Sequence, residues 1–178
     1  MNALSPTPTT FWREPEIGEP AHGWFVDLAD RNAQFSVRAL ASQLEEVNGR
    51  NVVPTEMLNF AKRYPLKHLD RLEWATPIME GRDVHLMGVT VRKQHWSRNP
   101  RRFCPACLGE KPFHRTWWDL VKFKRCPWHD MDIVSTDIDG NEVKWHVPSF
   151  ERSEAHVDMF LKGIRRNDAP PMALESFI

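Results

Sequence analysis

The chain has 178 residues, 41% of them hydrophobic and 27% charged, with 24 basic side chains balancing 24 acidic ones. This composition excludes a disordered or fibrous protein and favours one domain, or two small units that share a core. No apolar run approaches the roughly 18 residues of a membrane helix, and the first residues lack the basic start and apolar centre of a signal peptide, so we expect a cytoplasmic protein.

Residues 1–20 are expected to form an extended arm. They are rich in Pro, Thr and Glu, and they contain two large aromatic side chains, Phe11 and Trp12. We expect both aromatic side chains to anchor the arm to the body of the protein.

Residues 21–80 are predicted to form a helical N-terminal part. Apolar side chains recur at i, i+3, i+4 and i+7 spacing in four stretches, and Trp24, Phe25 and Leu28 share one face of the first. The stretches are 21–28, 36–49 with Ser36 as N-cap, 54–64 opened by Pro54, and 65–76 opened by Pro65. Two of these helices could form a helix-turn-helix that reads DNA, although packed helices without that role are the commoner arrangement.

Strand-like patterns follow. Alternating apolar residues at 84–91 predict a strand interrupted at Gly88. A hairpin is predicted around Asp139-Gly140-Asn141, between Ile133-Val134 and the alternating Val143, Trp145 and Val147. A last helix is expected over 148–164, and the tail to Ile178 is apolar enough either to fold back on the body or to dock a partner.

All three cysteines lie in two short motifs, Cys104-Pro-Ala-Cys107 and Cys126-Pro-Trp-His129. Zinc takes four tetrahedral nitrogen and sulfur ligands, and such turns direct two side chains at one ion. We expect the four residues to hold one structural Zn²⁺, because four protein ligands leave no open position for water or substrate. The alternatives are ordinary buried thiols, a redox Cys-x-x-Cys, and His114 as a ligand in place of His129.

Residues 92–129 carry ten basic and two acidic side chains, a net charge of +8. Aromatic residues are interleaved with the basic ones, a composition that suits phosphate contacts and base stacking. The residues expected to bind nucleic acid or an acidic partner are Arg101, Arg102, Arg115, Lys122, Lys124 and Arg125. The alternative is a solvated face over a tryptophan-rich zinc core.

Together these patterns predict an α+β fold that is mainly α, in which a helical cluster packs on a zinc-knuckle unit with short strands. The expected divisions are the arm at 1–20, the helical part at 21–80, the zinc-knuckle unit at 81–147, and the C-terminal helix and apolar tail at 148–178.

Three motifs of the basic segment, Arg102-Phe-Cys-Pro-Ala-Cys-Leu108, His114-Arg115-Thr-Trp117 and Arg125-Cys-Pro-Trp-His129, occur in this order. Their order resembles that of the TniQ family of transposon target-selection proteins. Upstream, Gly18-Glu19 and residues 24–32 are similar to the family's N-terminal segment. The chain departs from the family at Pro20, where relatives have serine, and after Cys126, where many relatives have a further cysteine pair.

The resemblance implies a non-enzymatic adaptor for target-site selection in DNA transposition, which bridges an AAA+ ATPase regulator and a DNA-bound or RNA-guided target module. In this interpretation residues 92–129 meet DNA or RNA, and the helical part or the tail meets the ATPase; self-association is left open. The chain also has no recognisable phosphate-binding glycine loop or nucleophile motif. The alternatives are a stand-alone nucleic-acid-binding zinc regulator without an ATPase partner and, more distantly, a zinc hydrolase.

Overall fold

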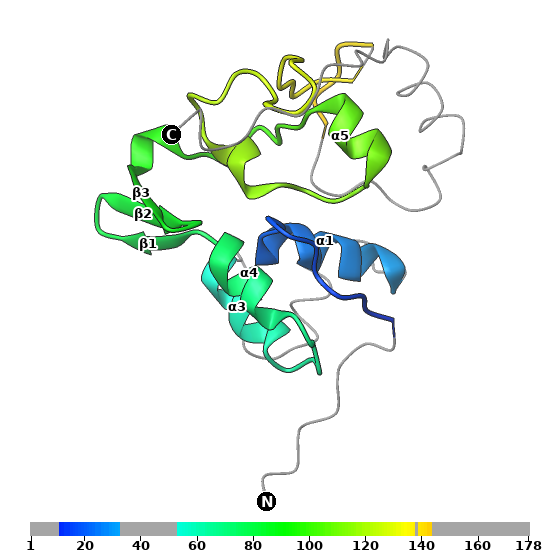
Figure 1. The fold of residues 1–178 in the computed structure, drawn as a ribbon, viewed down its shortest axis with the longest axis vertical. Coiled ribbons are helices and arrows are strands. Elements are labelled where there is room, and N and C mark those ends of the chain that lie inside the picture. The colour runs from blue at the N-terminus through cyan, green and yellow to red at the C-terminus, as the bar shows by residue number, and fades with distance from the viewer. Residues whose placement is uncertain (1–10, 33–52, 138, 144–178) are drawn as a thin grey trace, which may run out of the picture.

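The computed structural model describes residues 11–32, 53–137 and 139–143. The predicted helices at 36–49 and 148–164 and the apolar tail lie outside these residues. Figure 1 shows helices α1, α3 and α4 on one side, the cysteine-rich loops around α5 on the other, and a small sheet beside them. The described residues therefore form a mixed α+β fold, as predicted, but a helix-turn-helix arrangement is not established.

The first hydrophobic core lies between helices α1 (Ala21–Arg31), α3 (Pro54–Ala61) and α4 (Leu69–Ala75). The face predicted from helical spacing is confirmed, since Trp24, Phe25 and Leu28 are each only 1% exposed. Aromatic edges fill much of this core, with Phe25 packed against Phe60 at 5.0 Å and Trp24 against Tyr64 at 5.3 Å.

Helix α4 begins at Leu69, so the prediction that it begins at Pro65 was wrong. Residues 65 and 66 instead have no regular structure and residues 67 and 68 form a turn. The backbone N–H groups of Lys67 and His68 donate to the carboxylate of Glu14, both at 3.1 Å. Glu14 thus supplies, from the arm, an acceptor for N–H groups just before the helix. Nothing in the local sequence around Pro65 could have revealed this long-range contact.

The sheet is antiparallel, in the order β1-β2-β3, with β1 at Ile78–Glu80, β2 at Asp83–Leu86 and β3 at Val89–Arg92. The interrupted strand predicted at 84–91 is in fact two strands joined by Met87-Gly88, both of which have positive φ. Positive φ at both central residues is typical of a type I′ turn, which matches the twist of an antiparallel pair. Later in the chain, the described part of the predicted hairpin pairs Thr136 with Glu142.

The second core has little regular structure around it. The described residues there form helix α5 (Pro105–Glu110), the 3₁₀ helices η1 (Lys93–His95) and η2 (Thr116–Asp119), and isolated strand bridges. The fully buried members of this core are Phe103, Cys104, Cys107, Cys126 and Trp118.

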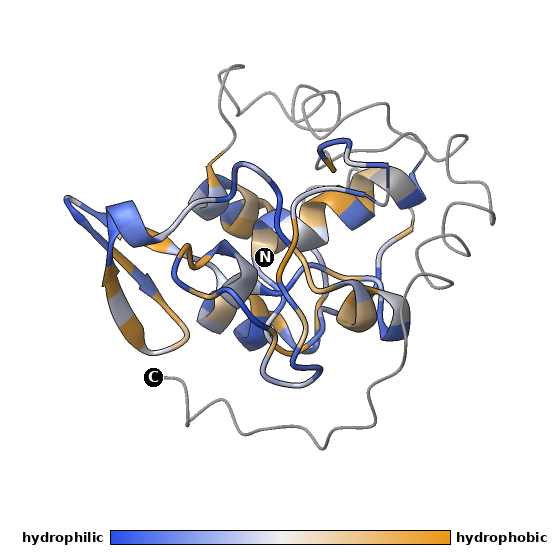
Figure 2. Cartoon of the chain, turned by 90° about the horizontal axis from the view of Figure 1, so that it is seen from above, coloured by the Kyte–Doolittle hydropathy of each residue, from blue (hydrophilic) through white to orange (hydrophobic). Residues whose placement is uncertain are grey.

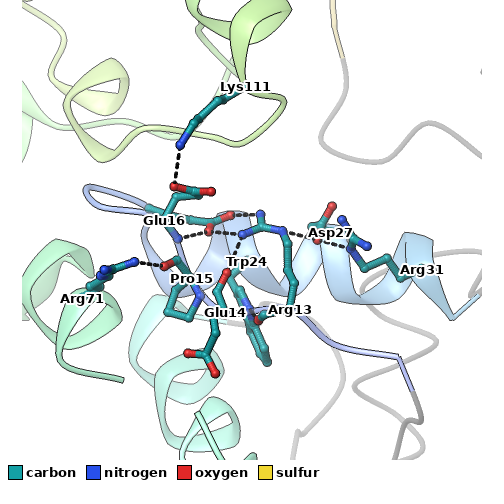
Figure 3. A network of polar contacts seen from close by, with 10 residues as sticks. Arg13, Glu14, Pro15, Glu16, Trp24, Asp27, Arg31, Arg71 and Lys111 are labelled. Atoms are coloured by element: carbon teal, nitrogen blue, oxygen red, sulfur yellow. Dashed lines mark hydrogen bonds and ion pairs between the residues drawn. The ribbon is translucent and has the colours of Figure 1, made fainter. Parts of the chain in front are cut away.

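The arm is held by a polar network that Figure 3 shows from close by. The guanidinium of Arg13 donates to both carboxylate oxygens of Glu19, at 2.8 and 2.6 Å, and to Asp27 at 2.8 Å. Of the two predicted anchors, Trp12 packs its ring on Tyr64. Phe11 is 64% exposed, so its side chain does not anchor the arm.

Two further contacts extend the arm across the molecule. Lys111, beyond α5, pairs with Glu16 at 3.2 Å, and Arg71 of α4 donates to the carbonyl of Pro15 at 3.0 Å. The arm therefore touches both halves of the fold. Among the described helices, none has the length and apolar character needed to cross a bilayer.

Gly18 lies where the arm meets the second core. Its φ is +79°, its carbonyl accepts the N–H of Thr116 at 2.9 Å, and a Cβ at this position would lie 2.5 Å from the Trp117 ring. The backbone conformation and the close approach both require glycine.

Gly18→Ala is therefore expected to lower the free energy of unfolding by about 2–4 kcal/mol, combining the cost of positive φ with overpacking. Gly88→Ala is the matched control, because Gly88 also has positive φ (+74°) but no atom lies within 4 Å of its Cβ position. Urea unfolding followed by tryptophan fluorescence should show a clearly larger loss for Gly18→Ala. Equal losses of unfolding free energy in the two variants would mean that overpacking against Trp117 adds nothing to the cost of Gly18→Ala.

Candidate metal centre

The structure brings together all four residues predicted to bind metal. Cys104 immediately precedes α5 and Cys107 lies in its first turn, while Cys126 and His129 flank a tight turn in a separate segment. One ligand atom from each of the four lies within 4.8 Å of all the others. Pro105 occupies the first position of α5, where its fixed φ suits the start of a helix.

The distances between the ligand atoms fit a tetrahedral zinc site. Zinc bonds of 2.3 Å to sulfur and 2.0–2.1 Å to nitrogen give tetrahedral edges of roughly 3.8 Å between sulfurs and roughly 3.5 Å between sulfur and nitrogen. The Sγ atoms of Cys107 and Cys126 are 3.5 Å apart. The Nδ1 atom of His129 lies 3.7, 3.3 and 3.6 Å from the sulfurs of Cys104, Cys107 and Cys126.

The surrounding polar groups also fit a metal centre. The Nε2 atom of His129 is 3.0 Å from Oε1 of Glu110, which leaves Nδ1 directed at the three sulfurs. Backbone N–H groups of Cys107 and Trp128 donate to the sulfurs of Cys104 and Cys126. A carboxylate on the outer nitrogen of a ligating histidine fixes its tautomer and raises its basicity.

The three thiols lie close enough to hydrogen bond to one another, and each shifts the pKa of its neighbours. The pKa of Cys107 is raised because its thiol hydrogen bonds to Cys104 and Cys126 and because burial disfavours the thiolate. The pKa of Cys126 is lowered to about 2, because the thiols of Cys104 and Cys107 donate to it. A soft divalent cation would displace the remaining protons, so the donor set fits Zn²⁺.

His114, the alternative ligand, belongs to a different cluster. Its Nε2 atom lies 3.0 Å from Oδ1 of Asp119, and the Nε2 atom of His22 lies 2.9 Å from Oδ2 of the same carboxylate. All three side chains are at most 2% exposed. His22 comes from α1 and Asp119 from η2, so this cluster connects the helical half to the cysteine-rich half.

Asp119 is ionised in this cluster despite its burial. Burial alone would raise its pKa, but the two histidines outweigh it and lower the pKa to about 2. For His114, burial disfavours the imidazolium more than Asp119 favours it, and the pKa falls to about 4. Sequence reasoning missed His22 and Asp119, because 97 residues separate them and no local spacing connects them.

The predicted basic residues divide into internal and exposed groups. Arg115 is 8% exposed, stacks over Phe113 at 4.2 Å and donates to the Cys107 carbonyl at 3.2 Å. Arg102 donates to the backbone carbonyls of Leu120 and Phe123. Both guanidinium groups therefore support the fold.

The other predicted basic residues are more accessible. Arg101 is partly buried, whereas Lys122, Lys124 and Arg125 are exposed. Arg125 forms an ion pair with Asp130 at 2.9 Å. The exposed residues Lys122, Lys124 and Arg125 are therefore the main candidates for the predicted surface that binds nucleic acid or an acidic partner.

Comparison with known proteins identifies the family. The family model described as TniQ matches residues 11–132, which is more than half of the chain. The search against curated proteins returned no match. The chain therefore belongs to the TniQ family, and the match covers residues 11–20 of the arm, the described helices, the sheet and all four residues of the cysteine-histidine cluster.

We expect purified protein to contain one zinc ion per chain and His129→Asn to lose most of it, because Nδ1 of His129 completes the tetrahedron. His114→Gln is the matched control and should retain zinc, since His114 pairs with Asp119 instead. Metal analysis by mass spectrometry, with circular dichroism to check folding, measures both. Loss of zinc from folded His114→Gln with retention in His129→Asn would reverse the assignment.

Stability should depend on pH through His114, which faces Asp119, His22 and Arg101. Its pKa is about 4 in the folded chain and about 6.5 when unfolded. The unfolded state therefore binds more protons below pH 6.5, and stability is lost as pH falls from 6.5 to 4. Asp119, with a pKa of about 2, adds its own loss only as pH falls below about 4.

Gln at position 114 keeps an N–H donor for Asp119 but does not titrate. Between pH 6.5 and 4, the unfolding free energy of the wild type should fall more steeply than that of His114→Gln, by up to about 1.4 kcal/mol per pH unit. Urea titrations of both zinc-loaded proteins test this difference. Parallel pH profiles would show that His114 is not held neutral by the fold.

Proposed function

We propose that this TniQ-family chain is a non-enzymatic adaptor that links an AAA+ ATPase regulator to a DNA-bound or RNA-guided target module. Family membership implies a role associated with target selection in transposition. The bridging role is our proposal, as is a structural Zn²⁺ held by Cys104, Cys107, Cys126 and His129.

The observation that carries the non-enzymatic assignment is the closed geometry of the cysteine-histidine cluster. One ligand atom from each of Cys104, Cys107, Cys126 and His129 lies within 4.8 Å of the other three, and the three cysteines are buried. A hydrolytic zinc site keeps one position for water, and this donor set leaves none. Zinc chemistry here would consist of holding the loops together, which supports an adaptor over a zinc hydrolase.

A segment with exposed apolar side chains, residues 74–79, runs from the end of α4 into β1 and offers a contact for a protein partner. Trp74 of α4 and Ile78 and Met79 of β1 are 47%, 40% and 37% exposed. These three large apolar residues lie within six positions of the chain. Ile78 and Met79 are neighbours on a strand, so their side chains point to opposite faces of the sheet. Exposed aromatic and methionine side chains are enriched at protein interfaces, so we assign the ATPase contact to Trp74 and Met79 of this segment.

The second contact of the adaptor would be with nucleic acid. Lys122, Lys124 and Arg125 are exposed on the segment that joins the two halves of the metal cluster. Both ends of this segment, Cys107 and Cys126, belong to the cluster. The cluster therefore fixes the position of the backbone that carries the three cations. We propose that they contact phosphates of the target nucleic acid.

The test is a pull-down with a purified AAA+ transposition regulator from the same genome, with and without DNA and ATP. The wild-type chain should be retained by the ATPase. Trp74→Ala/Met79→Ala should reduce retention at least tenfold, because truncating a tryptophan at an interface hot spot costs about 2 kcal/mol or more. Ile17→Ala is the control, since Ile17 is 66% exposed but lies in the arm.

No retention of the wild type under any condition would contradict the bridging role. If the chain then bound nucleic acid alone, with a steep dependence on salt, it would be a stand-alone zinc regulator. If Trp74→Ala/Met79→Ala were retained as well as the wild type, the bridging role would stand but the ATPase contact would be wrongly assigned.

A further inference from the structure

A basic cleft lies at one end of the sheet. Its residues 92–94 begin the basic segment that the sequence predicted to meet nucleic acid, but none of its lining residues is among the six side chains singled out for binding. The cleft has a volume of about 650 Å³ and is lined by Gly81, Arg82, Arg92, Lys93 and Gln94. Three of these five residues are cationic, and all five are exposed. Figure 2 shows the sheet at the edge of the molecule, with hydrophilic residues gathered at one end.

The backbone holds the cationic residues in fixed positions. Arg82 lies in the β1–β2 turn, and its carbonyl accepts the N–H of Lys93 at 2.9 Å, which ties the turn to the start of η1. Arg92 is paired in register with Asp83 on the neighbouring strand. The cleft is therefore built on the sheet, and the three cations are presented from two adjacent segments.

The local charges leave the cleft positive. Asp83 accepts from Nη1 of Arg92 at 2.9 Å, which neutralises one cation and orients its guanidinium. Within the described parts of the chain, no ion pair joins Arg82 or Lys93 to an acidic side chain. Glu80, the other acid near the turn, is directed at His85, at 3.4 Å.

The lining groups suit phosphate oxygens. The guanidinium groups and the ammonium of Lys93 are hydrogen-bond donors only, and Gln94 adds an amide. Gly81 has a φ of +60°, and no atom lies within 4 Å of its Cβ position, so a ligand can approach the turn backbone closely. The lining contains neither large apolar side chains to enclose an organic molecule nor a carboxylate to bind a cation.

We propose that this cleft binds the phosphate backbone of a nucleic acid. An open cleft leaves a small anion largely hydrated, whereas a nucleic acid supplies successive phosphates and gains from counterion release at each cation. The proposal extends the proposed target-selection role, which would bring the chain to nucleic acid, but it requires no ATPase.

The experiment measures binding of the full, zinc-loaded chain to fluorescent probes of equal length: duplex DNA of mixed sequence, single-stranded DNA and RNA. Anisotropy titrations from 50 to 200 mM NaCl give the slope of log K against log salt concentration. Arg82→Ala/Lys93→Ala should reduce the steepness of that slope by about two, since each lost phosphate contact removes about one. Affinity at the lowest salt should fall about tenfold.

The control is Lys62→Ala/Lys67→Ala, which removes the same charge from exposed positions near α3 and α4 and should change the slope much less. Lys122→Glu/Lys124→Glu tests the other basic surface in parallel. The proposal that the cleft binds phosphates is supported if Arg82→Ala/Lys93→Ala lowers the steepness of the salt dependence, either for the duplex alone or for all three probes.

Three results would overturn the proposal: unchanged binding of Arg82→Ala/Lys93→Ala, a slope change no larger than that of the control, or no binding of any probe by the wild type. None of these depends on retention by the ATPase. Failure of the cleft and failure of the bridge can therefore be distinguished.

Discussion

The second half of the fold depends on the convergence of Cys104, Cys107, Cys126 and His129 on one point. The described residues around this cluster form one six-residue helix, short 3₁₀ turns and isolated bridges, so backbone hydrogen bonding alone gives little cooperativity. A structural Zn²⁺ would join two segments about twenty residues apart and contribute on the order of 10 kcal/mol, as in zinc-finger peptides. The buried aromatic core could then form around a fixed point.

The two halves are joined by a second constraint, the buried carboxylate of Asp119. It accepts hydrogen bonds from His22 of α1 and from His114, and the close approach of these elements leaves no room for a side chain at Gly23. A Cβ at Gly23 would lie 2.9 Å from the Cβ of His114. Like Gly18 against Trp117, Gly23 allows the halves to pack directly, so the relative placement of the candidate partner surfaces is a property of the fold.

Local patterns in the sequence were enough to predict much of this structure. Helical spacing predicted the buried face of α1, and the two Cys-Pro motifs predicted a cluster whose ligand atoms the structure brings together. Contacts between distant segments could not be predicted in this way. Glu14 accepts the backbone N–H groups just before α4, and Asp119 pairs with a histidine 97 residues away. Arg115 appeared to be a surface cation in the sequence, but it stacks on aromatic rings inside the second core.

The proposed adaptor role rests first on the nature of the metal centre, because a site with four protein ligands distinguishes a structural zinc unit from a zinc hydrolase. Zinc K-edge X-ray absorption on the purified chain tests that centre most directly. The account predicts four neighbours: three sulfurs at about 2.3 Å and a single lighter atom, the histidine nitrogen, at about 2.0 Å. Fewer than three sulfurs, more than one lighter neighbour, or no zinc in the folded protein would contradict it.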